Sequence, residues 1–104
     1  DVAGIRCAGL YAAQADWAAT HGLRGPTAKQ RKDIELHLTR AEIYRRDQGQ
    51  SLTKAYESTR TDVLRVIGLY TDRFSERAKD GGHPWQGDAL IRSDSGYCKV
   101  LGRD

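Results

Sequence analysis

The feature that most constrains this chain is a long series of apolar residues at helical spacing in its second half. The series recurs at intervals of three, four and seven residues, as one face of an α-helix does; its members are Leu52, Tyr56, Val63, Ile67, Tyr70, Phe74 and Ala78. Ser51 supplies a good N-cap before it, and Gly81 and Gly82 end it. This is the strongest periodic signal in the sequence, and it predicts an all-α protein in which this helix is the spine.

Two more long helices are predicted before the spine. The first spans residues 2–21 and ends at Gly22, and its apolar positions are Cys7, Leu10, Tyr11, Trp17 and Ala18. A turn with two glycines and a proline follows, and then Thr27 and Gln30 have the spacing of a capping box. The second helix should run from there to about Asp47 and stop before Gly49.

The last segment, residues 88–101, is predicted to be a short helix capped by Asp88. Its polar run from Ser93 to Gly96 also suits a turn, and we interpret Asp94 as a turn residue, with a buried acid as the alternative. Residues 1–104 are therefore expected to form one domain. Its architecture is a small antiparallel bundle of three long helices plus a short C-terminal helix.

A close crossing is expected between the first helix and the spine. Small residues at spacings of three and four form a stripe in the first helix: Ala8, Ala12, Ala15 and Ala19. Gly68 lies within the spine, where the apolar arc widens to include Leu64, Val66 and Leu69. The prediction is that Gly68 allows the alanine stripe to approach, and that the wide arc meets neighbours on more than one side.

The only two cysteines, Cys7 and Cys98, lie near opposite ends of the sequence. The chain contains no methionine and begins at Asp1, as it would after removal of a secretory signal. An even cysteine count in a short, exported chain favours a disulfide over two free thiols. We therefore expect Cys7 and Cys98 to be bonded, the protein to be periplasmic or secreted, and the bond to hold the last helix against the first.

No motif for catalysis, metal binding or a cofactor is present. The three histidines, His21, His37 and His83, have no metal-ligand spacing, and no nucleophile elbow or haem-attachment motif occurs. Asp72 and Glu76 are one turn apart but lie opposite the apolar face, so a solvated pair is expected. No stretch is long and apolar enough to span a membrane. We expect no catalytic activity, no metal and no cofactor.

The second helix carries the best candidate for a binding surface. Leu36 and Ile43, seven residues apart, project away from its inner face and share their side with Lys29, Lys32 and Arg40. An apolar pair among basic groups suits a protein partner, which includes a second copy of this chain. The alternative is that this helix is sandwiched in the bundle, so that Leu36 and Ile43 meet a further helix. Trp85, in a glycine-rich loop, is a further candidate contact, or it folds back over the end of the bundle.

The function predicted from these features is that of an exported protein-binding module of the inhibitor, immunity or envelope-complex type. An alternative is a cytosolic bundle that binds nucleic acid through the basic region 24–46. We rank it lower, because acids interleave with its bases and the net charge is only +3. A weaker alternative is a small enzyme or ligand carrier with a site near His37, Tyr44 and Tyr70.

Overall fold

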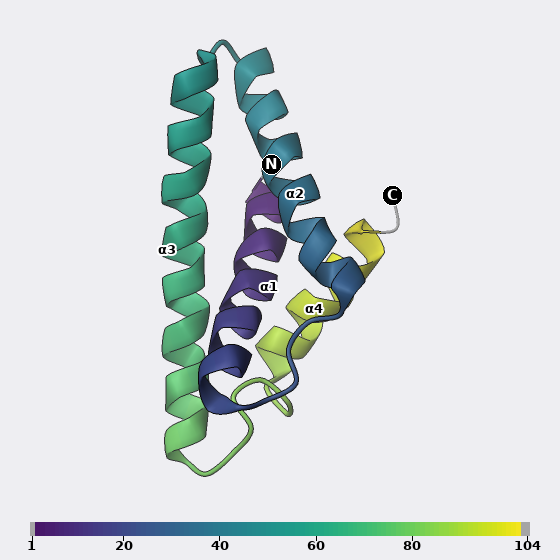
Figure 1. Ribbon diagram of the computed structural model, residues 1–104, viewed down its shortest axis with the longest axis vertical. Coiled ribbons are helices and arrows are strands. Elements are labelled where there is room, and N and C mark those ends of the chain that lie inside the picture. The colour runs from purple at the N-terminus through teal and green to yellow at the C-terminus, as the bar shows by residue number, and fades with distance from the viewer. Residues whose placement is uncertain (1, 103–104) are drawn as a thin grey trace.

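The computed structural model describes residues 2–102, which form four helices joined by short loops (Figure 1). The helices are α1 (Val2–His21), α2 (Ala28–Asp47), α3 (Leu52–Lys79) and α4 (Ala89–Leu101). The predicted all-α bundle of three long helices and a short C-terminal helix is confirmed. Asp94 lies inside α4, so its interpretation as a turn residue is wrong.

The helix starts follow the local sequence. Thr27 and Gln30 form both hydrogen bonds of the predicted capping box at the start of α2. The side chains of Ser51 and Asp88 accept hydrogen bonds from the amides of Lys54 and Ile91, as N-caps do. After α1 the chain turns at Gly22, whose φ of 68° is a left-handed value that favours glycine.

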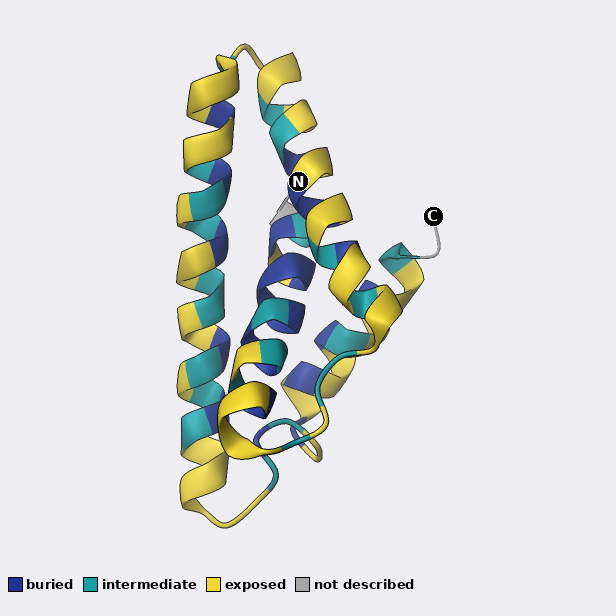
Figure 2. Cartoon of the chain, viewed as in Figure 1, coloured by how far each residue is buried: buried dark blue, intermediate teal, exposed yellow. Residues whose placement is uncertain are grey.

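The centre of the fold is α1, and the prediction that α3 is the spine is wrong. Within residues 2–102, the backbone of α1 lies close to all three other helices, whereas the backbone of α3 lies close to α1 and α2 but not to α4. Figure 2 shows the consequence, because buried surface runs along most of α1 but follows a single stripe of α3. Leu64 and Leu69 on α3 are 66% and 64% exposed, so the wide apolar arc does not meet neighbours on several sides as expected.

The close crossing exists, but the glycine that permits it is Gly9 rather than Gly68. A Cβ atom at Gly9 would lie 2.4 Å from Cγ1 of Val66 on α3. At Gly68 the same atom would meet nothing within 4 Å. Gly4 has a similar role toward α2, where its Cβ would lie 3.3 Å from the His37 carbonyl oxygen. Both close approaches therefore depend on glycines of the central helix.

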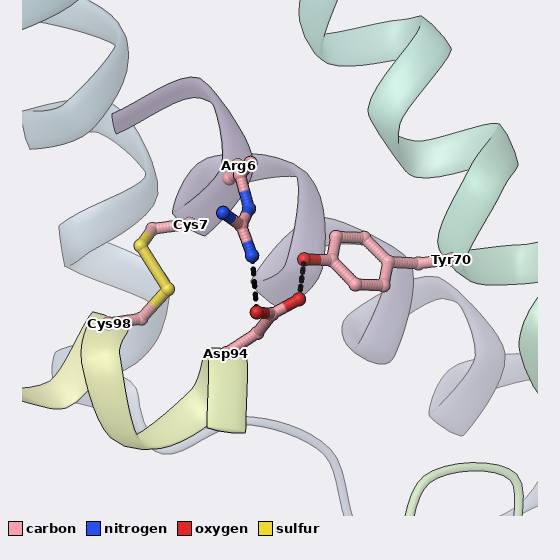
Figure 3. The surroundings of a disulfide bond; sticks show 5 residues. All are labelled: Arg6, Cys7, Tyr70, Asp94 and Cys98. Atoms are coloured by element: carbon pink, nitrogen blue, oxygen red, sulfur yellow. Dashed lines mark hydrogen bonds and ion pairs between the residues drawn. A yellow bond between two sulfur atoms is a disulfide. The ribbon is translucent and has the colours of Figure 1, made fainter. Parts of the chain in front are cut away.

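The predicted disulfide between Cys7 and Cys98 joins α1 to α4, with 5.5 Å between the two Cα atoms (Figure 3). Both cysteines are buried, in a core cluster that also contains Leu10, Tyr11 and Phe74. Within the described residues, α1 is the only helix against which the backbone of α4 packs closely. The bond is therefore placed where α4 has its main support.

Candidate functional site

The outer face of α2 carries the apolar pair singled out in the sequence. Leu36 is 37% and Ile43 54% exposed, and within residues 2–102 the backbone of α2 lies close to α1 and α3 but not to α4. The buried residues of α2 are on other sides of the helix and include His37, Leu38 and Ala41. α2 is thus packed on one side only, which leaves Leu36 and Ile43 available to a second molecule.

The three basic residues expected beside this pair differ in whether they form ion pairs. Lys32 and Arg40 are exposed, and neither forms an ion pair within the described part of the chain. Lys29 instead bonds intramolecularly, since its Nζ atom lies 3.1 Å from Oδ2 of Asp33 and 3.1 Å from the Gly102 carbonyl oxygen. Lys29 therefore ties α2 to the end of α4. We define the α2 surface as Lys32, Leu36, Arg40 and Ile43.

Trp85 lies far from the α2 surface in the sequence and packs against the bundle end. Its ring is half-buried, and its centroid lies 5.0 Å from that of Phe74. The His83 ring meets Trp85 edge-on at 4.9 Å. This arrangement matches the second interpretation given for Trp85, in which the ring folds back over the core. The partly exposed remainder of the ring lines a shallow pocket with residues of α4.

His37 lines a pocket of about 280 Å³ at the start of α1, together with Gly4, Arg40 and Tyr44. Burial lowers the pKa of His37, so its ring is neutral near pH 7. Its Nε2 atom is buried and has no hydrogen-bond partner in the described residues. Tyr70 does not join this pocket and lies on α3 beside Asp94, so the expected convergence of His37, Tyr44 and Tyr70 is wrong.

Asp94 is a buried acid that links three helices (Figure 3). One of its carboxylate oxygens forms an ion pair with Arg6 of α1. The other accepts a hydrogen bond of 2.7 Å from the Tyr70 hydroxyl of α3. Burial and the hydrogen bond to this carboxylate raise the pKa of Tyr70 to about 12, so the hydroxyl keeps its proton and continues to donate.

A second buried carboxylate, Asp88, holds two arginines of α3. The Nε atoms of Arg73 and Arg77 lie 2.7 and 2.8 Å from the same oxygen of Asp88, which is fully buried. Burial alone would raise the pKa of Asp88, but the hydrogen bonds from Arg73, the Ile91 amide and Arg77 outweigh it and hold the pKa well below its usual value. The sequence prediction identified Asp88 only as a cap. The ion pairs were not predicted, although Arg73 and Arg77 are one helical turn apart and this spacing indicates that they can share one carboxylate partner.

The described residues contain no cluster of three or more His, Cys, Asp or Glu side chains placed to hold a metal ion. None of the helices within residues 2–102 combines the length and the hydropathy needed to cross a bilayer.

No protein-family profile matches the sequence, and neither a curated protein nor a solved structure gives a significant match. The function must therefore be inferred from the chain's own surfaces.

Proposed function

We propose that this chain is an exported protein-binding module whose contact surface is the outer face of α2. The observation that supports the proposal is the exposure of Leu36 and Ile43 between Lys32 and Arg40, whose charges no described acid neutralises. Exposed apolar side chains next to arginine are typical of interface centres, whereas isolated ones are common on any surface. Leu36 and Ile43 lie two helical turns apart on one face, so a partner can bury both side chains at once.

The chemistry of the α2 surface defines the complementary partner. An acidic helix or loop with its own apolar side chains would pair its carboxylates with Lys32 and Arg40 and cover Leu36 and Ile43. Binding through one face of a small domain is compatible with an inhibitor, an immunity protein or a subunit of an envelope complex. The disulfide supports export, because such bonds persist in oxidising compartments.

Nucleic acid fits this surface less well than an acidic protein does. Two of the basic residues of α2 are already committed, Lys29 to Asp33 and Arg45 to Asp62 at 2.6 Å. Only a few charges remain to neutralise phosphates along the helix, and phosphate binding depends on their number. A small-molecule carrier would use the pocket at His37, which shares Arg40 with the α2 surface but is not lined by Leu36 or Ile43.

The test is capture of a partner from envelope extract by the oxidised protein, with size-exclusion chromatography and light scattering to detect a second copy. Charge reversal of the α2 surface by K32E with R40E should abolish capture or self-association. L36S with I43S should weaken it by about tenfold or more, since each buried leucine-sized side chain contributes roughly 1.5 to 3 kcal/mol.

The matched control reverses two exposed bases elsewhere, K54E with R92E, which gives the same net charge but leaves α2 intact. Neither residue forms an ion pair in the described structure. A strict monomer that retains no partner, or capture that the control abolishes equally, contradicts the proposal. Steeply salt-dependent binding to duplex DNA or RNA in place of a protein supports the nucleic-acid alternative.

A further inference from the structure

The groove between α3 and α4 is separate from the α2 surface and has its own chemistry. It has a volume of about 410 Å³ and is lined by Arg6 of α1, by Val66, Leu69, Tyr70 and Arg73 of α3, and by Leu90 and Asp94 of α4. The four α3 residues are at positions i, i+3, i+4 and i+7, so they form one continuous stripe of that helix. Both α3 and α4 pack on α1, but their backbones do not approach each other closely, and the groove lies between them.

The groove has apolar walls. Leu69 is 64% and Leu90 47% exposed, and they line it from α3 and from α4 respectively. Val66 also lines the groove and is half-buried against α1. Exposure of these apolar side chains to water is unfavourable. An alkyl chain that covered them would gain about 25 cal/mol of binding free energy for each Å² of apolar surface removed from water. The volume of about 410 Å³ is within the range of small-ligand sites.

The polar groups of the groove favour an anion over a cation. Asp94 is buried and both of its oxygens already have a partner, one in Arg6 and the other in the Tyr70 hydroxyl, so little of this carboxylate is presented to a ligand. Asp88, the partner of Arg73, is fully buried. The side chains of Arg6 and Arg73 remain 49% and 40% exposed, and the bond from Arg73 uses only its Nε atom. Each buried carboxylate thus holds one nitrogen of a guanidinium group, and the other N–H donors of these half-exposed groups remain for solvent or a ligand.

We propose that this groove binds a single-chain fatty carboxylate, with the alkyl chain between Leu69 and Leu90 and the carboxylate on the guanidinium of Arg73. Arginine matches a carboxylate with two parallel N–H donors, and the terminal nitrogens of Arg73 are the ones its ion pair leaves unused. A concave slot for one chain fits a dissolved monomer better than it fits the surface of a bilayer.

The experiment uses the oxidised, 15N-labelled protein titrated with sodium laurate below its critical micelle concentration. Amide shifts of Val66, Leu69 and Leu90 should move and saturate. Dodecyltrimethylammonium, which has the same chain length and a cationic head, should bind about tenfold or more weakly, because the groove exposes two guanidinium groups while the carboxylate in its lining, Asp94, is buried.

Two matched pairs of variants test the wall and the head-group contact. L69S should weaken laurate binding about tenfold, whereas L64S, at an equally exposed leucine outside the groove, should leave it unchanged. R73Q should remove the preference for laurate over the cationic amphiphile. R77Q loses the same kind of bond to Asp88 but does not line the groove, so it should keep that preference.

Several results would overturn the proposal. They are unchanged laurate affinity in both L69S and R73Q, equal binding of the cationic amphiphile, and shifts that map to Leu36 and Ile43 instead of the groove. Binding to anionic vesicles without any binding of laurate monomers would also overturn it. None of these results bears on partner capture by the α2 surface, so failure of one proposal is distinguishable from failure of the other.

Discussion

At the scale of single residues, two buried carboxylates organise the side of the molecule where α3 faces α4. Asp88 and Asp94 each accept from an arginine and from a second donor, and both lie on or next to α4. Buried ionised groups are stable only when they are paired and fully hydrogen-bonded. These two residues therefore fix how α4 sits relative to α3, although the two helices have no direct backbone packing.

Asp88 has two separable roles, which the variants D88N and D88A distinguish. D88N keeps an acceptor for the Ile91 amide but loses the charge that holds Arg73 and Arg77. We expect it to lower the free energy of unfolding by about 1.5 to 3 kcal/mol, the usual range for hydrogen bonds to charged groups. D88A also loses the N-cap, which costs about 1 kcal/mol more. Urea unfolding at neutral pH measures both, and equal stability of D88N and wild type would contradict the ion-pair role.

The same residue should make stability depend on pH on the acid side. The pKa of Asp88 is lower in the folded chain than its ordinary value of 3.8, so its contribution is complete above that value. As pH falls below 3.8, the unfolded chain takes up the proton first and this stabilisation is lost. Between pH 5 and pH 3, an interval of about two units that covers the onset of proton uptake by the unfolded chain, urea unfolding should show a smaller loss of stability for D88N than for wild type.

At the scale of helices, the decisive contacts are the two places where α1 comes close to its neighbours. Gly9 meets Val66 of α3, and Gly4 meets the backbone of α2 at His37. A glycine inside a helix costs about 1 kcal/mol relative to alanine. That cost is offset at Gly9 by the packing that the missing side chain allows, and it is not offset at Gly68, where the added atom would meet nothing.

G9A and G68A should therefore change stability in opposite directions. G9A places a methyl group 2.4 Å from a methyl group of Val66, so α1 and α3 must separate or Val66 must shift. We expect a loss of about 1 to 3 kcal/mol, as for other overpacked sites. G68A should add about 1 kcal/mol through helix propensity. Thermal unfolding of the two variants checks this, and stabilisation by G9A would contradict the crossing described here.

At the scale of the whole molecule, the disulfide holds a helix that otherwise has little support. α4 has 13 residues and packs closely only on α1, while its links to α2 and α3 are side-chain hydrogen bonds and ion pairs. Isolated helices of that length are marginal in water. The bond between Cys7 and Cys98 spans 91 residues of sequence, so it restricts nearly the entire unfolded chain.

Removing the bond in a C7A/C98A variant should lower the free energy of unfolding by about 2 to 5 kcal/mol. Amide hydrogen exchange should rise most in α4, because α1, α2 and α3 still pack on one another. Wild-type protein kept oxidised is the control. Uniform loss of protection in all four helices would instead show that α4 is part of one cooperative unit with the rest.

Local sequence was sufficient to predict the helices. The ends of each helix are set by caps, glycines and apolar periodicity, which act over a few residues, and Thr27, Ser51 and Asp88 cap as their sequence positions predict. The disulfide was predicted from the even number of cysteines and from the expectation that the chain is exported. Leu36 and Ile43 were identifiable as an outward-facing pair from their spacing alone, and their exposure agrees with it.

Only the tertiary structure decided which helix is central, which glycine marks the crossing, and where the buried acids bind. Those features depend on which faces of distant segments meet, and periodicity says that a face is apolar without saying which neighbour covers it. Gly9 and Gly68 are both glycines in the interior of a helix, yet of the two only Gly9 lies against another helix. The long apolar stripe of α3 determined that the protein is helical, whereas packing on α1 determined that much of that helix stays exposed and that a groove remains beside α4.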